Sequence, residues 1–130
     1  MTINHVVIWI DHKETHILYY DSSLNQLIKS QSNHPHVHHK ANEIGSGKAL
    51  EDRKYFHSVI CAVAIVNEIL VMGPGSAKIE FLKFVALHEP ILSKKIIGVE
   101  TCDHPTDPQI IAFAKKYFHR IDKLLPINAE

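Results

Sequence analysis

The chain has 130 residues, with 14 basic and 14 acidic side chains, 45% apolar residues and 22% charged residues. These values are typical of one folded domain, and they argue against disordered, collagen-like and coiled-coil proteins. A formal charge of zero argues against a protein that wraps nucleic acid mainly by electrostatics, because each neutralised phosphate needs a lysine or arginine. We therefore expect a single domain over residues 1–130.

No segment has the length and apolar character of a membrane helix. The longest apolar run covers Val59 to Val66, whereas a membrane span needs about 20 residues. Residues 1–5 lack the features of a signal peptide, so we expect a cytoplasmic protein without membrane contact. Cys61 and Cys102 have no paired spacing, and we expect each to be a buried free thiol.

The first part of the chain has the pattern of three strands joined by short turns. Val6 to Ile10 is an unbroken apolar run rich in β-branched residues, which is typical of a strand buried on both faces. A polar turn separates it from a second expected strand, Thr15 to Tyr20, so the two predict a hairpin. The third expected strand, Gln26 to Ser30, is more polar, which favours a sheet edge.

The rest of the chain alternates between helical and strand patterns. The expected elements are a helix over Glu51 to Val66, a strand over Glu68 to Met72, a helix over Ala77 to His88 and a strand over Lys95 to Thr101. Thr106-Asp107-Pro108-Gln109 matches a capping box and predicts the start of a last helix, whose apolar stripe runs from Ile110 to Ile121. The order β-β-β-α-β-α-β-α predicts an α/β fold with a ribonuclease-H-like mixed sheet of five strands.

A ribonuclease-H-like fold first suggests nuclease chemistry, because two-metal cleavage needs several carboxylates at the strand ends. Asp11 follows the first strand, but the fourth strand ends in Met72-Gly73-Pro74, where a carboxylate would be needed. We therefore interpret Asp11 as a hairpin-turn residue, and Asp103 and Asp107 as residues of a turn and a helix start.

The segment Gln31 to Lys48 has no apolar period, and we expect a long loop there. Four histidines, His34, His36, His38 and His39, lie within six residues of each other. Neutral imidazoles bind zinc, copper or nickel, so the cluster is a candidate metal site. Imidazoles also stack on bases and bond to phosphates, which makes the cluster a candidate RNA contact. The structural alternative is a solvated polar loop.

The turn Gly73-Pro74-Gly75-Ser76 joins an expected strand to an expected helix. Free backbone N–H groups at a helix start can hold a phosphate, and the Lys78 ammonium could add a positive charge. The spacing is not that of a P-loop, and a tight turn without a ligand is the alternative.

Three segments together resemble the small bacterial proteins labelled translational machinery proteins. They are Trp9-Ile10-Asp11-His12, His38 to Gly47, and Val99 to Pro105. Those proteins are similar to the middle domain of archaeal and eukaryotic class-1 peptide release factors and of Pelota, whose Gly-Pro-Gly-x-x-Lys-x-x-Phe turn matches Gly73 to Phe81. The resemblance implies a translation-related protein with the ribosome or tRNA as partner.

The resemblance also implies which residues contact RNA. In release factors the loop between the third strand and the first helix carries Gly-Gly-Gln, which positions water against the peptidyl-tRNA ester. Here that loop contains Gly45-Ser46-Gly47 without a following Gln, so we expect RNA contact without hydrolysis, catalytic residues or a cofactor. The expected RNA-contacting residues are His36, His38, His39, Lys40, Gly45, Gly47, Lys48 and Lys78. The alternatives are a peptidyl-tRNA ester hydrolase with His38 or His39 as general base, and a metal-binding domain built on the histidine loop.

Overall fold

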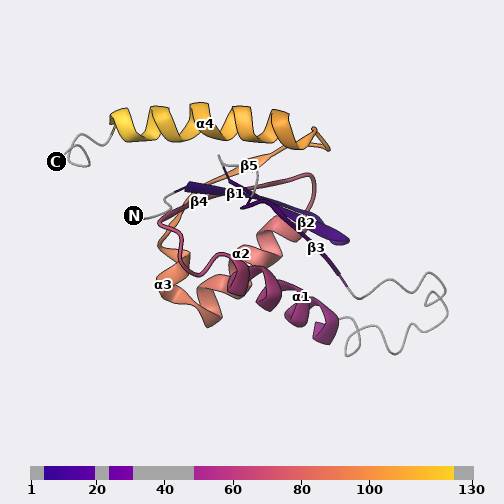
Figure 1. Ribbon diagram of the computed structural model, residues 1–130. Coiled ribbons are helices and arrows are strands. Elements are labelled where there is room, and N and C mark those ends of the chain that lie inside the picture. Colours follow the sequence, from indigo (N-terminus) through magenta and orange to yellow (C-terminus); the bar gives the residue numbers. More distant parts are fainter. Residues whose placement is uncertain (1–4, 20–23, 31–48, 125–130) are drawn as a thin grey trace.

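The computed structural model of the chain describes residues 5–19, 24–30 and 49–124 (Figure 1). The described elements are β1 (His5–Ile10), β2 (Glu14–Tyr19), β3 (Gln26–Lys29), α1 (Ala49–Ala62), β4 (Glu68–Gly73), α2 (Ala77–His88), α3 (Pro90–Ser93), β5 (Ile96–Thr101) and α4 (Asp107–Leu124). No helix in these ranges is both long enough and apolar enough to cross a membrane.

The strands form one mixed sheet in the spatial order β3-β2-β1-β4-β5. β1 pairs with β2, and β2 with β3, in antiparallel orientation. β1 pairs with β4, and β4 with β5, in parallel orientation. The predicted α/β class and the mixed five-stranded sheet are therefore confirmed, and β3 lies at the sheet edge as expected.

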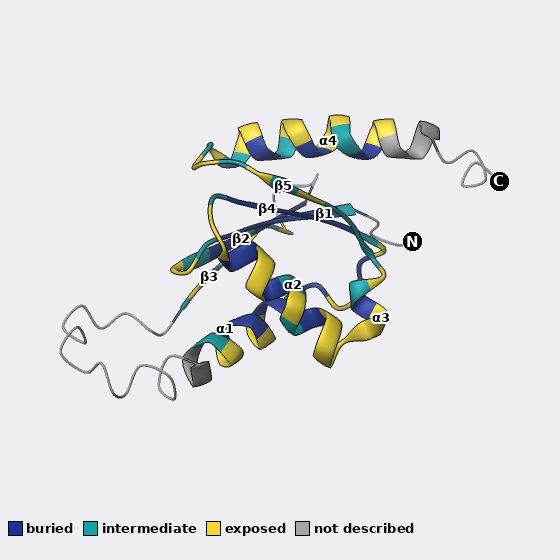
Figure 2. Ribbon diagram, turned by 180° about the vertical axis from the view of Figure 1, so that it is seen from behind, coloured by how far each residue is buried: buried dark blue, intermediate teal, exposed yellow. Residues whose placement is uncertain are grey.

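The sheet separates two apolar cores. α1 and α2 cover one face, whereas α4 lies on the other face and turns its buried side toward the strands (Figure 2). β1 contributes to both cores, because Ile8 and Ile10 pack toward α1 and α2 while Val7 and Trp9 pack toward α4. This two-sided burial explains the unbroken apolar run of β1.

The end of α1 differs from the sequence prediction. The helix ends at Ala62, and the N–H groups of Val63 and Val66 donate to the carbonyls three residues earlier, Ile60 and Val63. Five of residues 59–66 are β-branched, and such side chains crowd the preceding helical turn. The apolar spacing therefore extends beyond Ala62, although the α-helical hydrogen bonding ends there.

Several smaller differences also appear. β2 begins one residue earlier than expected, β3 ends at Lys29, and the four-residue helix α3 was not predicted. Cys61 and Cys102 are free thiols as expected, but the predicted burial is wrong, because Cys61 is exposed and Cys102 is only partly buried. Tyr20, the expected end of the second strand, lies outside the described residues.

The capping box that starts α4 is confirmed. The backbone N–H of Gln109 donates to Thr106 Oγ1 at 3.3 Å, and the N–H of Thr106 donates to Gln109 Oε1 at 2.9 Å. Each side chain thereby satisfies a backbone donor that the helix leaves unpaired. The box fixes the point at which α4 begins, immediately after the β5–α4 connection.

Gly73, Lys78 and Phe81 have structural roles in and after the Gly-Pro-Gly turn between β4 and α2. A Cβ atom on Gly73, whose φ is +159°, would overlap the backbone carbonyl oxygen of Ile10 in the neighbouring strand. The ammonium of Lys78 is buried and donates to the carbonyl of Gly75 at 2.7 Å. Phe81 is fully buried in the core between the sheet and α1. These contacts hold β1, β4 and α2 together.

A buried hydroxyl pair joins α1 to the β1–β2 hairpin. The Tyr55 hydroxyl donates to the carbonyl of Asp11 at 2.9 Å and accepts a hydrogen bond from Thr15 Oγ1 at 2.7 Å. Thr15 is fully buried. Burial raises the pKa of Tyr55 well above its usual range, so the phenol stays a neutral donor.

We predict that Tyr55→Phe lowers the free energy of unfolding by about 1–3 kcal/mol, because it leaves buried polar groups without a partner. Urea denaturation measures this change. Tyr117→Phe is the matched control, since the Tyr117 hydroxyl has no hydrogen bond in the described part of the chain, and we expect a change of less than about 0.5 kcal/mol. Equal effects of the two substitutions would contradict the assigned role of Tyr55.

We predict that Gly73→Ala destabilises the fold by about 1–3 kcal/mol, because the added methyl group meets rigid backbone in β1. Gly75→Ala is the control in the same turn, since a Cβ there meets no atom within 4 Å. Thermal unfolding of both variants compares the positions directly. A Gly73→Ala protein as stable as Gly75→Ala would show that β1 and β4 do not approach so closely.

Candidate functional site

Several polar segments meet at one edge of the sheet. β1, β4 and β5 run parallel, so their carboxyl ends lie together, and α2 and α4 begin next to them. We call residues 11–14, 73–77 and 101–107 the carboxyl edge. The N–H of Ser30, directly after β3, donates to the carbonyl of Lys13 at 2.8 Å. The segment 31–48 therefore leaves the described chain beside the carboxyl edge.

Trp9 holds the β5–α4 connection against the end of β1. Its indole is buried, and the indole N–H donates to the backbone carbonyl of Asp103 at 2.9 Å. The ring of His104 lies over the indole with centroids 4.9 Å apart. On the neighbouring strand, His16 meets the indole edge-on at 5.5 Å. Trp9 thus contacts both His16 of β2 and the β5–α4 connection.

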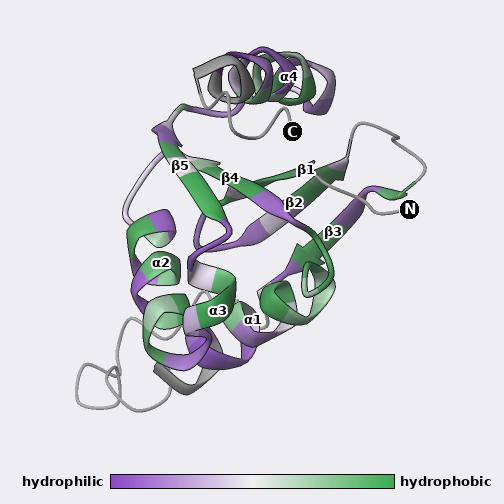
Figure 3. Ribbon diagram, turned by 90° about the vertical axis from the view of Figure 1, so that its left-hand side faces the viewer, coloured by the Kyte–Doolittle hydropathy of each residue, from purple (hydrophilic) through white to green (hydrophobic). Residues whose placement is uncertain are grey.

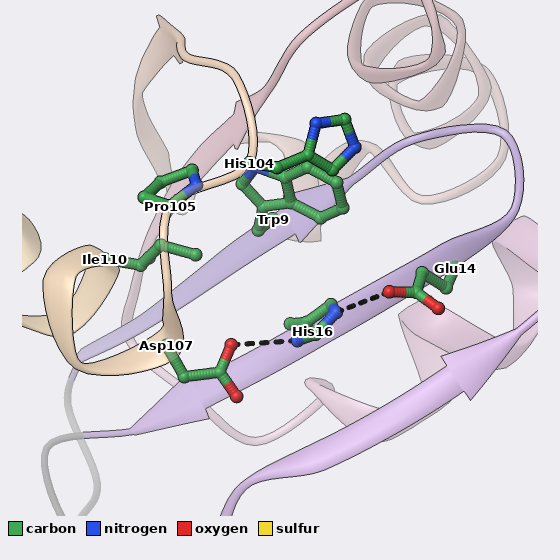
Figure 4. A pocket seen from close by; sticks show the side chains of 7 residues that line it. All are labelled: Trp9, Glu14, His16, His104, Pro105, Asp107 and Ile110. Atoms are coloured by element: carbon green, nitrogen blue, oxygen red, sulfur yellow. Dashed lines mark hydrogen bonds and ion pairs between the residues drawn. The ribbon is translucent and has the colours of Figure 1, made fainter.

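His16 lies between two carboxylates. Its Nε2 is 2.8 Å from Glu14 Oε2, and its Nδ1 is 2.9 Å from Asp107 Oδ1 (Figure 4). A neutral imidazole has one N–H group and can donate to only one acceptor. Both contacts are hydrogen bonds only when both ring nitrogens carry protons. The three side chains join β2 to the first turn of α4.

These side chains border a pocket of about 180 Å³ at the carboxyl edge. Its lining combines aromatic and apolar groups with the two carboxylates, and it consists of Trp9, Glu14, His16, His104, Pro105, Asp107 and Ile110. Figure 4 shows the His104 and Trp9 rings above the row formed by Asp107, His16 and Glu14. A planar group with hydrogen-bond donors is chemically matched to such walls.

His104 is the exposed member of this group. Its Nδ1 is 2.8 Å from Asp103 Oδ1, and its Nε2 is 3.5 Å from Asp11 Oδ2. The hydrogen bond to Asp103, with a further contribution from Asp11, raises the pKa of His104 above its usual value. The carboxyl edge therefore gains a positive charge at a higher pH than an isolated histidine would allow.

Asp11 has the turn role expected from the sequence. Its Oδ1 accepts hydrogen bonds from the backbone N–H groups of Lys13 at 2.8 Å and Glu14 at 2.9 Å. These bonds form the tight connection of the β1–β2 hairpin. Asp107 is the first residue of α4, but its side chain also binds His16, a contact that the sequence analysis did not predict.

Of the predicted RNA-contacting residues, the structure describes only Lys78. Its buried ammonium donates a hydrogen bond to the Gly75 carbonyl in the turn and does not project freely from the surface. The other seven lie outside the described residues, and they are His36, His38, His39, Lys40, Gly45, Gly47 and Lys48. The candidate metal cluster His34, His36, His38 and His39 lies outside them as well. Within residues 5–19, 24–30 and 49–124, no group of three or more His, Cys, Asp or Glu side chains could hold a metal ion.

The sequence analysis missed the pocket. No functional role was predicted for His16 or His104. Alternation along β2 places Glu14 and His16 on one face, and the pairing of Trp9 with His16 places them beside the indole. Predicting the pocket would therefore have required the register of the β1–β2 hairpin.

Comparison with known proteins shows a release-factor-like fold. No family model and no curated protein matches the chain. The archaeal translation termination factor aRF1 superposes with a TM-score of 0.51 and 12% identity, over 96% of this chain and 41% of that chain. The termination-like factor Dom34 of S. cerevisiae gives a TM-score of 0.50 and 10% identity, over 97% and 41% of the two chains. The chain thus spans less than half the length of these proteins, and the similarity to release-factor-like proteins inferred from the sequence is confirmed for the fold.

We predict that NMR titration of His104 gives a pKa above 6.5 and that Asp103→Asn lowers it. Because the pKa is raised in the folded protein, pairing of charged His104 favours folding below the unfolded pKa. That contribution is lost as the pH rises through the folded pKa. An unchanged His104 pKa in Asp103→Asn would contradict the assigned cause.

Proposed function

We propose that this protein is a translation accessory domain of release-factor ancestry, which contacts the ribosome or tRNA through its histidine-rich loop without hydrolysing an ester. The proposal is supported by the release-factor-like fold shared with aRF1 and Dom34. The same proposal includes a ribonuclease-H-like fold, a single domain over residues 1–130, membership of the bacterial translational machinery proteins and a cytoplasmic location.

The observation that most favours RNA contact at this position is where the loop leaves the sheet. Residues 31–48 connect Ser30, which is bonded to the hairpin turn, with the start of α1 at Ala49. In the proposed complex, RNA lies along the carboxyl edge. The loop supplies imidazoles and ammonium groups from His36, His38, His39, Lys40 and Lys48, while Gly45 and Gly47 allow close approach of the backbone.

Two further histidines of the carboxyl edge extend this surface. His104 has a raised pKa, and its side chain is 62% exposed. His12 is exposed in the hairpin turn, where its Nε2 is 3.3 Å from Ser76 Oγ. Lys78 contributes indirectly, since it stabilises the adjacent turn through Gly75. Protonated imidazoles at this edge would provide the phosphate contacts that the neutral net charge does not.

We predict that the wild-type protein co-sediments with ribosomes at low salt and that His36→Ala/His38→Ala/His39→Ala reduces the bound fraction several-fold, because three contacts are removed. The control is His57→Ala/His88→Ala/His119→Ala, which removes the same number of histidines from helix positions away from the loop. We expect this control to co-sediment like wild type.

Equal co-sedimentation of the loop variant and wild type would contradict the proposed role of the loop. A parallel assay tests the absence of hydrolysis. Release of amino acid from an aminoacyl-tRNA analogue above the buffer rate would replace the accessory role with that of an ester hydrolase.

A further inference from the structure

We propose that the pocket at the carboxyl edge binds a guanine base of single-stranded RNA. This inference rests on the proposed function and specifies which part of the RNA the described residues recognise. It follows from the open surface around the pocket, the chemistry of its walls and its location near the hairpin turn to which Ser30 is bonded.

The pocket opens onto a part of the sheet that α4 leaves uncovered. α4 packs against β1 and β2, and β3 lies at the edge opposite β5 (Figure 3). On β3, Leu27 pairs with His16 and Lys29 pairs with Glu14, so the four side chains share one face. Leu27 is 52% exposed, and Lys29 is exposed as well. A single strand of RNA can cross this face from β3 toward the pocket.

The walls of the pocket suit a flat aromatic ring. His104 contacts the buried indole of Trp9 with the two ring planes tilted by 56°, and its imidazole remains largely exposed to a ligand. Pro105 and Ile110 supply apolar surface on the α4 side. Proteins that recognise unpaired RNA bases stack them on aromatic side chains in this way.

The polar wall selects a base that donates hydrogen bonds. Glu14 and Asp107 each use one carboxylate oxygen on His16, and the second oxygens, Glu14 Oε1 and Asp107 Oδ2, have no hydrogen bond within the described residues. An ionised carboxylate only accepts hydrogen bonds. The ligand must therefore bring hydrogen-bond donors, such as N–H groups, to this wall.

Guanine fits this requirement better than the other RNA bases. Its Watson–Crick edge presents two adjacent donors, N1–H and the N2 amino group. Adenine and cytosine place an amino group beside an acceptor, and uracil flanks its single N–H with two carbonyl oxygens, which a carboxylate repels. Two matched hydrogen bonds to one base typically change the affinity by about tenfold or more relative to a mismatched base.

Trp9 provides a direct probe because it is the only tryptophan in the chain and lines the pocket. The intact protein is titrated with GMP, AMP, CMP and UMP, and with two RNA hexamers that differ in one base, guanine or adenine. We expect saturable changes in Trp9 fluorescence at concentrations about tenfold lower for the guanine-containing ligand of each set. A response to the guanine-containing hexamer without a response to GMP would also support the proposal. It would show that the ligand is RNA and not a free nucleotide.

Carboxylate variants separate the pocket from general RNA affinity. At least one of Glu14→Gln and Asp107→Asn should reduce the preference for guanine about tenfold, because the adjacent donors of one base pair with one carboxylate. Glu89→Gln, at the far end of α2, is the matched control and should retain the preference. All three carboxylates are at least partly exposed, and melting temperatures close to wild type establish that the variants fold.

Three results would overturn the guanine site. They are equal affinity for all bases, an unchanged guanine preference in both carboxylate variants, and equally tight binding of arginine amide, which would indicate a guanidinium ligand. Ribosome co-sedimentation shows whether such a result contradicts only the guanine site or also the proposed function. Ribosome association without guanine preference would contradict only the pocket, whereas guanine binding without ribosome association would contradict only the accessory role.

Discussion

The hydrogen bond from the Trp9 indole to the Asp103 carbonyl fixes the geometry on which the candidate site depends. The indole is 2% exposed, so its N–H needs a partner inside the protein, and the β5–α4 connection supplies one at 2.9 Å. This bond holds His104 above Trp9 and brings Asp107 within reach of His16 on β2. Residues almost one hundred positions apart in the sequence thereby form one pocket.

The parallel arrangement of β1, β4 and β5 determines where such a pocket can form. In an open α/β sheet, ligands usually bind beyond the carboxyl ends of the strands, where helix starts and connections converge. Here the close approach of Gly73 to Ile10, the Lys78–Gly75 bond and the Tyr55–Asp11 bond all stabilise that edge. The β4–α2 turn thus maintains the fold beside the site.

Local patterns in the sequence predicted most of the fold. The capping box at Thr106 and the apolar run of β1 identified elements whose causes lie within a few residues. The end of α1 was misplaced because apolar spacing does not report the hydrogen bonding of a β-branched segment. The pocket could not be predicted, since it requires the pairing of Trp9 with His16 and a long-range bond to Asp103. The similarity to release factors pointed to the loop and left these pocket residues without a role.

In the proposed function, RNA binds along the carboxyl edge of a release-factor-like domain. Chemical-shift mapping of the ¹⁵N-labelled protein with a guanine-containing single strand tests it most directly. We expect the largest perturbations among the described residues to fall within 11–14, 73–77 and 101–107, and at the indole N–H of Trp9. Perturbations confined to the exposed faces of α1, α2 and α3, or none at saturating RNA, would contradict it.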